Sequence, residues 1–240
     1  SKLSAPKNSN LKTVMDFSFF DKINTAKNEQ TETWFKGLDR IYNNFVYDFL
    51  YPNPASVLAF IENHDTDRFL GEGNNLPMLK QASTLLLTTR RIPQLYYGTE
   101  VMMNGVKSKS DGYVRKDFPG GWTGDATNAL TPAGRTKIQN ECYDFYKTIL
   151  NWRKGNDVIA KGSMVQFMVQ NGVYAYARQY EGKTIFVMLN GTDAETTVPL
   201  KFYKEILKDS KQGKDILSGK AITFGEELKM GPRESLVIEL

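Results

Sequence analysis

A dense group of polar side chains directly follows a short apolar run in the first third of the sequence. Residues 57–61 (VLAFI) are all apolar, and residues 62–68 (ENHDTDR) then bring four charged groups and the only histidine of the chain. The apolar run is too short for a helix and too continuous for a half-exposed strand. It therefore predicts a strand buried on both faces, as in parallel sheets.

In parallel β/α folds, the catalytic and binding residues lie just past the carboxyl ends of the strands. A lone histidine is more often a structural residue, but the tripeptide Asn63, His64 and Asp65 at the end of a strand favours a functional role. We expect His64 and Asp65 to project into the mouth of the sheet. A carboxylate there can accept hydrogen bonds from substrate hydroxyls or offset developing positive charge.

The elements that would position these residues alternate between strand and helix. Short apolar runs predict strands at residues 13–17, 57–61 and 92–97. Helical spacing predicts one helix from about Glu32, ended by prolines 52 and 54, and a second helix at about residues 77–90. Two right-handed crossovers then give three parallel strands with helices on one side. The other side of such a sheet is bare, so this part reads as a slice of a larger fold.

A long glycine-rich loop at residues 98–130 precedes the clearest helical pattern. Thr131 as N-cap and Pro132 at the first position predict its start, and Gly155 predicts its stop. Beyond Gly155 the pattern changes to short runs of alternating or β-branched residues. These predict strands at residues 165–169, 173–180, 184–189, 196–200, 221–224 and 235–240. The dipeptides at 171–172 and 181–182 are hairpin signals. We therefore divide the chain at 155, with an antiparallel β domain at 156–240.

Two segments now match a known family. Residues 60–65 (FIENHD) resemble the fourth conserved segment of the alpha-amylase superfamily of glycoside hydrolases (family 13), F-x-x-N-H-D, at the end of the seventh barrel strand. Residues 92–100 (IPQLYYGTE) resemble the late segment G-I-P-x-x-Y-Y-G-x-E on the eighth strand, with Arg91 in place of its first Gly, and residues 14–17 resemble the sixth strand. The H-D-x-x-R pattern and residues 116–122 (KDFPGGW) are similar to neopullulanase and cyclomaltodextrinase-like members.

The resemblance implies a fold of α/β plus all-β class. Residues 1–155 would form about three β/α units of a (β/α)8 TIM barrel, strands six to eight with their helices. Residues 156–240 would form the C-terminal antiparallel β-sandwich. A complete barrel alone takes about 250 residues, so these 240 residues would be the C-terminal portion of a longer enzyme, and the N-terminal part of the barrel would be its missing partner.

The implied activity is retaining hydrolysis of α-glucosidic bonds, α-1,4 and possibly α-1,6, in starch-like glucans. Asp65 would be the family's third acid, which grips the sugar in the cleavage subsite, and His64 and Asn63 would bind the same sugar. Arg68 would orient the carboxylates or meet a hydroxyl, or else form a surface ion pair with Asp67. The loop aromatics Tyr113, Phe118 and Trp122 would either stack on glucose rings or anchor the loop.

The family's nucleophile and acid/base segments do not occur in this sequence, so we expect the chain alone to be inactive. Two alternatives remain open: a non-catalytic glucan-binding module, and a transglycosylase of the same superfamily. The expected partner is an α-glucan or maltooligosaccharide. No cofactor is expected; calcium is possible in the parent enzyme, although no ligand cluster is evident here.

Composition limits the remaining classes. The net charge of +4 is scattered, so nucleic acid is not an expected partner, and no apolar run reaches membrane-spanning length. Cys142 is the single cysteine and falls on an apolar helical stripe, which predicts a core position. Residues 1–10 lack the apolar centre of a secretory signal. A periplasmic or extracellular location is implied by the resemblance alone.

Overall fold

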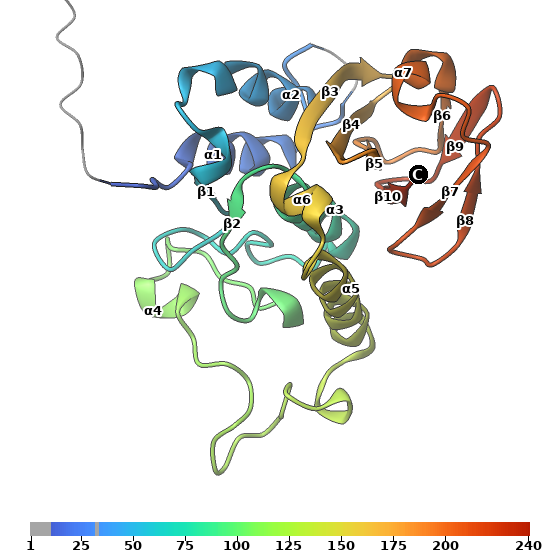
Figure 1. Cartoon of the computed structure of the whole chain (residues 1–240). Coiled ribbons are helices and arrows are strands. Elements are labelled where there is room, and N and C mark those ends of the chain that lie inside the picture. The colour runs from blue at the N-terminus through green and yellow to red at the C-terminus, as the bar shows by residue number, and fades with distance from the viewer. Residues whose placement is uncertain (1–10, 32–33) are drawn as a thin grey trace, which may run out of the picture.

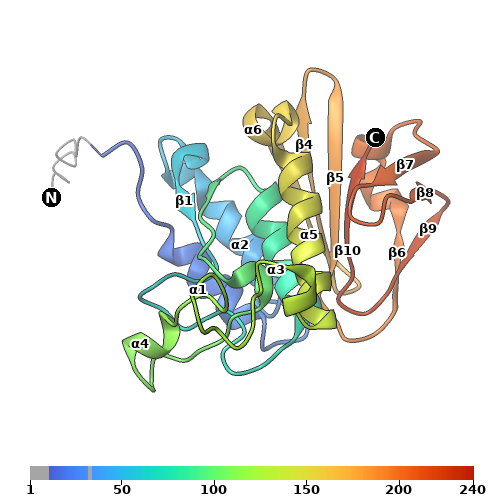
Figure 2. The same ribbon diagram turned by 90° about the horizontal axis from the view of Figure 1, so that it is seen from below.

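A computed structural model describes residues 11–31 and 34–240 of the chain. Figure 2 shows three layers that follow one another: a layer of helices, a long sheet that contains β4, β5 and β10, and a smaller layer with β6 and β9. The helices of the first layer accompany short parallel strands, whereas the other two layers are antiparallel (Figure 1). The expected change from parallel to antiparallel structure along the chain is therefore present.

Three parallel segments lie side by side in the first layer. Met15 forms a parallel bridge with Leu58, and β1 (Leu58–Ala59) pairs in parallel with β2 (Ile92–Pro93) through Leu58 and Ile92. Their order along the chain matches the expectation, but each segment is much shorter than predicted. Among the described residues β1 has neighbours on both sides, whereas Met15 and β2 each have one.

The predicted strand at residues 13–17 gives way early to a helix that the periodicity did not reveal. Helix α1 (Phe17–Ala26) begins directly after Asp16, whose Oδ1 accepts a hydrogen bond from the Phe19 N–H at 2.9 Å. Such an aspartate cap stabilises the first turn by about 1 kcal/mol. Helix α2 (Asp39–Val46) is shorter than predicted and continues as a 3₁₀ turn to Leu50. The expected helix start at Glu32 lies outside the described residues.

Helices α3 and α5 flank the long loop. Helix α3 (Leu76–Thr88) matches its predicted range within two residues. Helix α5 (Lys137–Arg153) starts later than predicted, because Thr136 and Gln139 form a reciprocal capping box, in which Gln139 Oε1 accepts from the Thr136 N–H at 2.9 Å. Thr131 and Pro132 instead lead a separate 3₁₀ turn. The short helices are α4 (Asp111–Val114), α6 (Asp157–Lys161) and α7 (Lys204–Leu207).

The C-terminal strands form two antiparallel sheets. The larger has the order β3-β4-β5-β10-β7-β8 and the smaller pairs β6 with β9. The strands are β3 (Ser163–Gln170), β4 (Val173–Tyr180), β5 (Lys183–Asn190), β6 (Thr196–Pro199), β7 (Gln212–Asp215), β8 (Ala221–Thr223), β9 (Glu227–Met230) and β10 (Ser235–Glu239). Both predicted hairpin turns are confirmed. Asn171 and Gly172 have φ angles of 49° and 77°, and Glu181 and Gly182 have 48° and 78°, as type I′ turns require.

The central strands β4, β5 and β10 of the larger sheet are buried on both faces, and alternation along each of them divides its side chains between two cores. Tyr174, Tyr176 and Val187 belong to the core shared with the helices. Val173, Phe186 and their alternating neighbours belong to a second core with the smaller sheet. The first core therefore joins residues on both sides of position 155.

A buried arginine also links the helices to the sheet. Arg178 on β4 is 1% exposed and donates to the carbonyl oxygens of Thr88 at 3.0 Å, Ile159 at 3.0 Å and Gly162 at 2.7 Å. Burial lowers the pKa of Arg178 to about 10. Its planar fork satisfies carbonyl groups at the ends of α3 and α6 that their helices leave free. Within the described ranges, no helix is both long and apolar enough to cross a membrane.

Candidate functional site

In the turn after β1, two exposed polar side chains follow residues that are buried. Phe60, Ile61 and Asn63 are each at most 2% exposed. Asn63 Oδ1 accepts from the Asp65 N–H at 2.8 Å, and the Asn63 N–H donates to Thr66 Oγ1 at 3.0 Å. These two bonds close a tight polar turn. Asn63 is therefore the inward anchor, and the side chains that follow it point outward.

The outward pair is His64 and Asp65, whose side chains are 60% and 58% exposed. His64 Nε2 lies 3.2 Å from Asp65 Oδ2. On the other carboxylate oxygen, Arg115 Nη2 lies 2.9 Å from Asp65 Oδ1, and Arg115 Nε donates to the His64 carbonyl at 2.8 Å. The Lys107 ammonium donates to the Asp65 carbonyl at 3.0 Å. Both carboxylate oxygens are thus oriented, and each keeps a further lone pair for a ligand.

Arg68 lies beneath this surface rather than on it. Its side chain is 0% exposed and pairs with Glu62, at 3.2 Å between Nη1 and Oε1. The alternative ion pair with Asp67 does not form, because Asp67 Oδ1 accepts from the Lys107 N–H at 2.5 Å instead. Since the chain's own atoms enclose the guanidinium, we correct the expected contact with a sugar hydroxyl. Arg68 supports the site from within.

The three loop aromatics lie in different surroundings. The segment around Trp122 projects away from the body in Figure 1, and Trp122 is 73% exposed. Tyr113 carries ammonium groups against its ring, with Lys116 Nζ 3.9 Å and Lys109 Nζ 4.6 Å from the centroid. These cation–π contacts are consistent with a ring that anchors the loop, while stacking on a glucose ring stays a prediction. Phe118 is half-buried in the same loop.

Three residues near Asp65 were missed by the sequence reasoning: Lys107, Asp111 and Arg115. Arg115 Nη2 also lies 3.2 Å from Asp111 Oδ2, an i, i+4 pair. That spacing was visible in the sequence, and it indicates a salt bridge across one helical turn. Nothing in the spacing shows that this pair lies against Asp65, which is 50 positions from Arg115. The contact arises from the path of the long loop.

This arrangement can bind a neutral polyhydroxylated ligand through oriented acceptors and donors, and it can place a negative charge against a developing cation. Metal binding has no comparable support: among residues 11–31 and 34–240, no three His, Cys, Asp or Glu side chains group closely enough to hold an ion.

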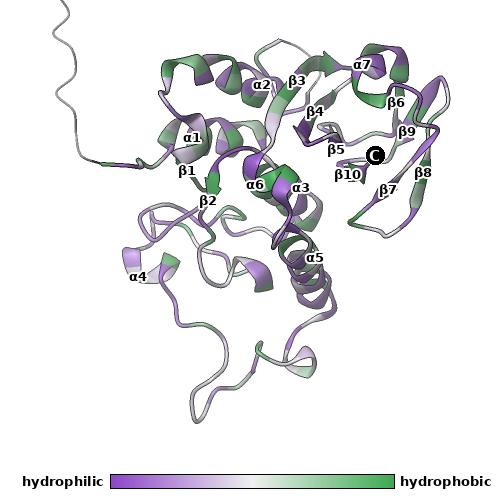
Figure 3. Cartoon of the chain, viewed as in Figure 1, coloured by the Kyte–Doolittle hydropathy of each residue, from purple (hydrophilic) through white to green (hydrophobic). Residues whose placement is uncertain are grey.

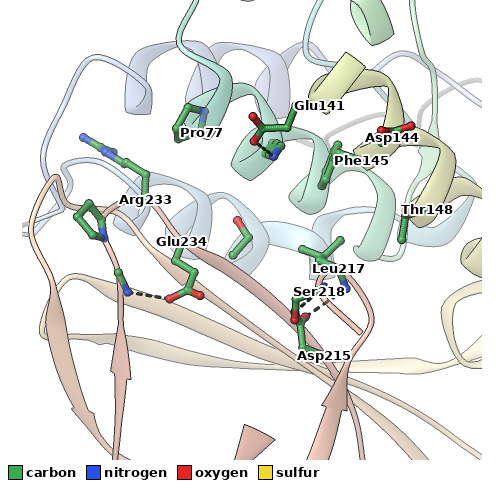
Figure 4. Close-up of a pocket in the computed structure, with 14 residues that line it drawn as sticks. Pro77, Glu141, Asp144, Phe145, Thr148, Asp215, Leu217, Ser218, Arg233 and Glu234 are labelled. Carbon is green, nitrogen blue, oxygen red and sulfur yellow. Dashed lines mark hydrogen bonds and ion pairs between the residues drawn. The ribbon is translucent and has the colours of Figure 1, made fainter. Parts of the chain in front are cut away.

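A separate cleft of about 600 Å³ lies between helices α3 and α5 and two turns of the larger sheet (Figure 4). Lys80 pairs with Glu141 on its wall, at 2.6 Å, and Phe145 supplies apolar surface. Asp215 on the opposite wall accepts from the Ser218 N–H at 2.9 Å. The side chains of the turn after β1 do not line this cleft, so it is not part of the candidate site.

Comparison with known proteins agrees with this architecture. Residues 164–239 match the family of cyclomaltodextrinase C-terminal domains. An alpha-amylase from Niallia circulans is 29% identical over 220 residues, which cover 88% of this chain and 37% of that protein. A cyclomaltodextrin glucanotransferase from Thermoanaerobacterium thermosulfurigenes is 30% identical over 211 residues, which cover 85% of this chain and 27% of that protein.

Comparison with solved structures finds the same kind of protein. The crystal structure of an alpha-amylase from Geobacillus thermoleovorans in complex with acarbose superimposes with a TM-score of 0.74 at 21% identity, covering 95% of this chain and 48% of that one. Fold and sequence together thus point to one group of similar proteins, alpha-amylases and cyclomaltodextrin glucanotransferases. Residues 164–239 thus match a cyclomaltodextrinase C-terminal domain, and the whole chain is similar to a C-terminal part of alpha-amylases and cyclomaltodextrin glucanotransferases, enzymes of the alpha-amylase superfamily, glycoside hydrolase family 13. The chain spans only 37% and 27% of the length of these two curated relatives.

Proposed function

We propose that this chain supplies one wall of the active centre of a retaining glycoside hydrolase that cleaves α-glucosidic bonds in starch-like glucans. The observation that carries the proposal is the Asp65 carboxylate, exposed at the end of β1 and oriented on both oxygens by His64 and Arg115. In such an enzyme Asp65 grips sugar hydroxyls at the cleavage subsite and stabilises the oxocarbenium-like transition state. His64 forms a hydrogen bond with the same sugar.

The proposal assigns the other catalytic groups to a part of the enzyme outside these 240 residues. Retaining hydrolysis needs a carboxylate nucleophile and a second carboxyl group that protonates the leaving oxygen. The two outer members of the three parallel segments support a larger sheet, because they expose apolar side chains: Met15 is 40% exposed and Ile92 on β2 is 44% exposed. We propose that further strands of a (β/α)8 barrel cover them, and that the chain alone is inactive.

The test is Asp65→Asn in the enzyme that contains this chain. Asparagine keeps the size of the side chain but removes the charge that faces the transition state. We expect kcat on maltooligosaccharides to fall on the order of 10²- to 10³-fold, with a much smaller change in KM, since the contact matters most in the transition state. Steady-state kinetics of both variants measure the split.

Asp67→Asn is the matched control, because its carboxylate holds the Lys107 backbone and does not touch the Asp65–Arg115 pair. We expect this control to retain most of the turnover. Near-normal turnover of Asp65→Asn would overturn the proposal. A loss of glucan binding without any loss of turnover per bound substrate would instead favour a binding module.

A glucan transferase is the second candidate. It is favoured by the match to a cyclomaltodextrin glucanotransferase over 85% of the chain. Both activities share the covalent intermediate and differ in whether water or a sugar accepts the glycosyl group. Incubation with maltotriose and separation of the products distinguishes them, since only transfer yields products longer than the substrate.

A further inference from the structure

Beneath the candidate site lies an ion pair that connects four segments of the chain. The side chains of Glu62 and Arg68 are 3% and 0% exposed. Arg68 donates from Nε to the Val114 carbonyl at 3.0 Å and from Nη1 to the Tyr97 carbonyl at 2.6 Å. Its guanidinium carbon lies 3.9 Å from the centroid of the Tyr96 ring. The arginine therefore contacts both residues 96–97, which directly follow β2, and Val114 in the long loop beyond them.

Glu62 completes the connection on the other side. Its carboxylate accepts from the Thr99 hydroxyl at 2.5 Å and from the Phe69 N–H. Residues 62 and 68–69 are the two ends of the turn that carries His64 and Asp65. Hydrogen bonds from Glu62 to Phe69 and Arg68 thus close this turn at its base.

Arg68 is linked to both members of the contact above it, to Asp65 along the chain and to Arg115 through the Val114 carbonyl. Arg68 is three residues from Asp65, and the Val114 carbonyl that it binds is adjacent to Arg115. Asp65 and Arg115 meet at 2.9 Å on the surface. A shift of Arg68 would therefore separate the carboxylate from the residue that orients it.

We propose that Glu62 and Arg68 are positioning residues, which act through the Asp65–Arg115 pair to fix the Asp65 carboxylate against the sugar. The proposal rests on the function proposed above, and it adds two buried residues that contact neither substrate nor solvent.

The chemistry of the pair fits this role better than a role in stability alone. A buried ion pair is often no more stabilising than apolar residues of the same shape, because both charges lose their hydration. Burial accordingly raises the pKa of Glu62, against the opposing effects of Thr99, Phe69 and Arg68. An arginine fork, however, offers donors in fixed directions. It can hold Glu62, Tyr97 and Val114 at once, which apolar residues cannot do.

The main test is Arg68→Lys in the enzyme that contains this chain. Lysine keeps the charge, but its three N–H donors radiate from one nitrogen on a flexible stem, so they cannot span acceptors that the planar guanidinium reaches from the separate nitrogens Nε and Nη1. We expect kcat to fall about tenfold to hundredfold, because small misplacements of catalytic groups have effects of this size, while KM stays within about twofold. We also expect backbone amides of residues 63–69 to exchange hydrogen about tenfold faster.

Arg178→Lys is the matched control. Arg178 is equally buried and also donates to several carbonyl groups, but it lies between the helices and the larger sheet. It should lose stability to a similar degree and leave both kcat and the exchange of residues 63–69 unchanged. If both variants lower kcat equally, or if Arg68→Lys leaves kcat unchanged, the positioning role is wrong.

Glu62→Gln is the second variant, because the amide keeps the shape but turns a donor toward either the Phe69 N–H or Arg68. It should reproduce the fall in kcat at nearly constant KM. If neither variant folds, the pair is a stability element and the inference is wrong. The two proposals fail separately. Full turnover in Asp65→Asn overturns the proposed function, whereas loss there with normal turnover in Arg68→Lys and Glu62→Gln overturns only this inference.

Discussion

The parallel and antiparallel regions of this chain differ in how completely they bury their apolar strands. The antiparallel strands β3, β4 and β5 are eight residues long and belong to a sheet with a core on each face. The parallel strands β1 and β2 are two residues long, and Ile92 on β2 is 44% exposed. In Figure 3, β2 has the colour of hydrophobic residues.

The difference follows from how each kind of sheet is built. Antiparallel strands pair through tight turns with the neighbours that follow them in the chain, so a short stretch completes its own ladder. Parallel strands need long crossovers, and the polar ends of those strands are left free for chemistry. The antiparallel region therefore completes most of its own strand pairing, whereas the parallel region carries the candidate site.

The largest expected effect is a substitution in the antiparallel region. Phe186 on β5 is 0% exposed and packs against Tyr203 with ring centroids 5.3 Å apart. Phe186→Ala leaves a cavity in the second core and should lower the free energy of unfolding by about 3–5 kcal/mol. Chemical denaturation monitored by circular dichroism measures the loss.

Phe17→Ala is the control for Phe186→Ala, since Phe17 belongs to the parallel region and is 55% exposed. It should cost far less, because water already reaches the ring. Equal losses at the two phenylalanines would remove the distinction between the regions.

A smaller effect on stability is expected in the core that the helices share with the larger sheet, and it should depend on pH. Cys142 on α5 is buried, and burial raises the pKa of its thiol to about 12 from 9.0. The folded state therefore holds this proton more tightly than the unfolded state. Stability from this group is complete below pH 9 and falls as pH rises toward 12, by up to about 1.4 kcal/mol per pH unit.

Denaturation curves of the native chain and of Cys142→Ala, compared between pH 8 and pH 11, isolate this contribution. The difference between the two proteins should shrink as the pH rises. The native thiol should also resist alkylation at pH 8 and react after unfolding. Rapid alkylation of the folded chain would show that this core is open to solvent.

The smallest effect is expected on the open face of the parallel strands. Ile92→Thr keeps the β-branched shape, and because Ile92 is half-exposed the free energy of unfolding should change by no more than about 0.5 kcal/mol. Val187→Thr makes a comparable change at a position that is 0% exposed and should cost about 1–3 kcal/mol. In the longer enzyme, Ile92→Thr should become costly if further strands cover this face; an unchanged cost there would contradict that arrangement.

The sequence predicted the fold best where local chemistry decides it. The hairpin dipeptides at 171–172 and 181–182 determine their own turns, so β3, β4 and β5 lie within two residues of their predicted ranges. Helix α1 was missed because its phenylalanines continue an apolar run and its start depends on the Asp16 cap. Strands β7 and β9 were missed because they are short and partly exposed, and their positions depend on β10 and β6 rather than on their own composition.

The candidate site shows the same division. His64 and Asp65 were identified because the family motif and the end of an apolar strand coincide there. The neighbours Lys107 and Arg115 reach Asp65 only through the path of a long loop, which no local pattern encodes. The interpretation of Arg68 as a contact residue was wrong because burial is a property of the folded whole: its guanidinium points back to Glu62 and Val114.

The position of β10 has a consequence for how the chain acquires its structure. This strand pairs with β5 on one side and β7 on the other, in the middle of the larger sheet. During synthesis, at roughly 5–20 residues per second, the β3-β4-β5 meander can form early, but its β5 edge stays open until β6 to β9 and then β10 have been made. An open strand edge invites pairing with other chains. The interval before β10 arrives is therefore the period in which a newly made chain is most exposed to aggregation, and β10 acts as the strand that ends it.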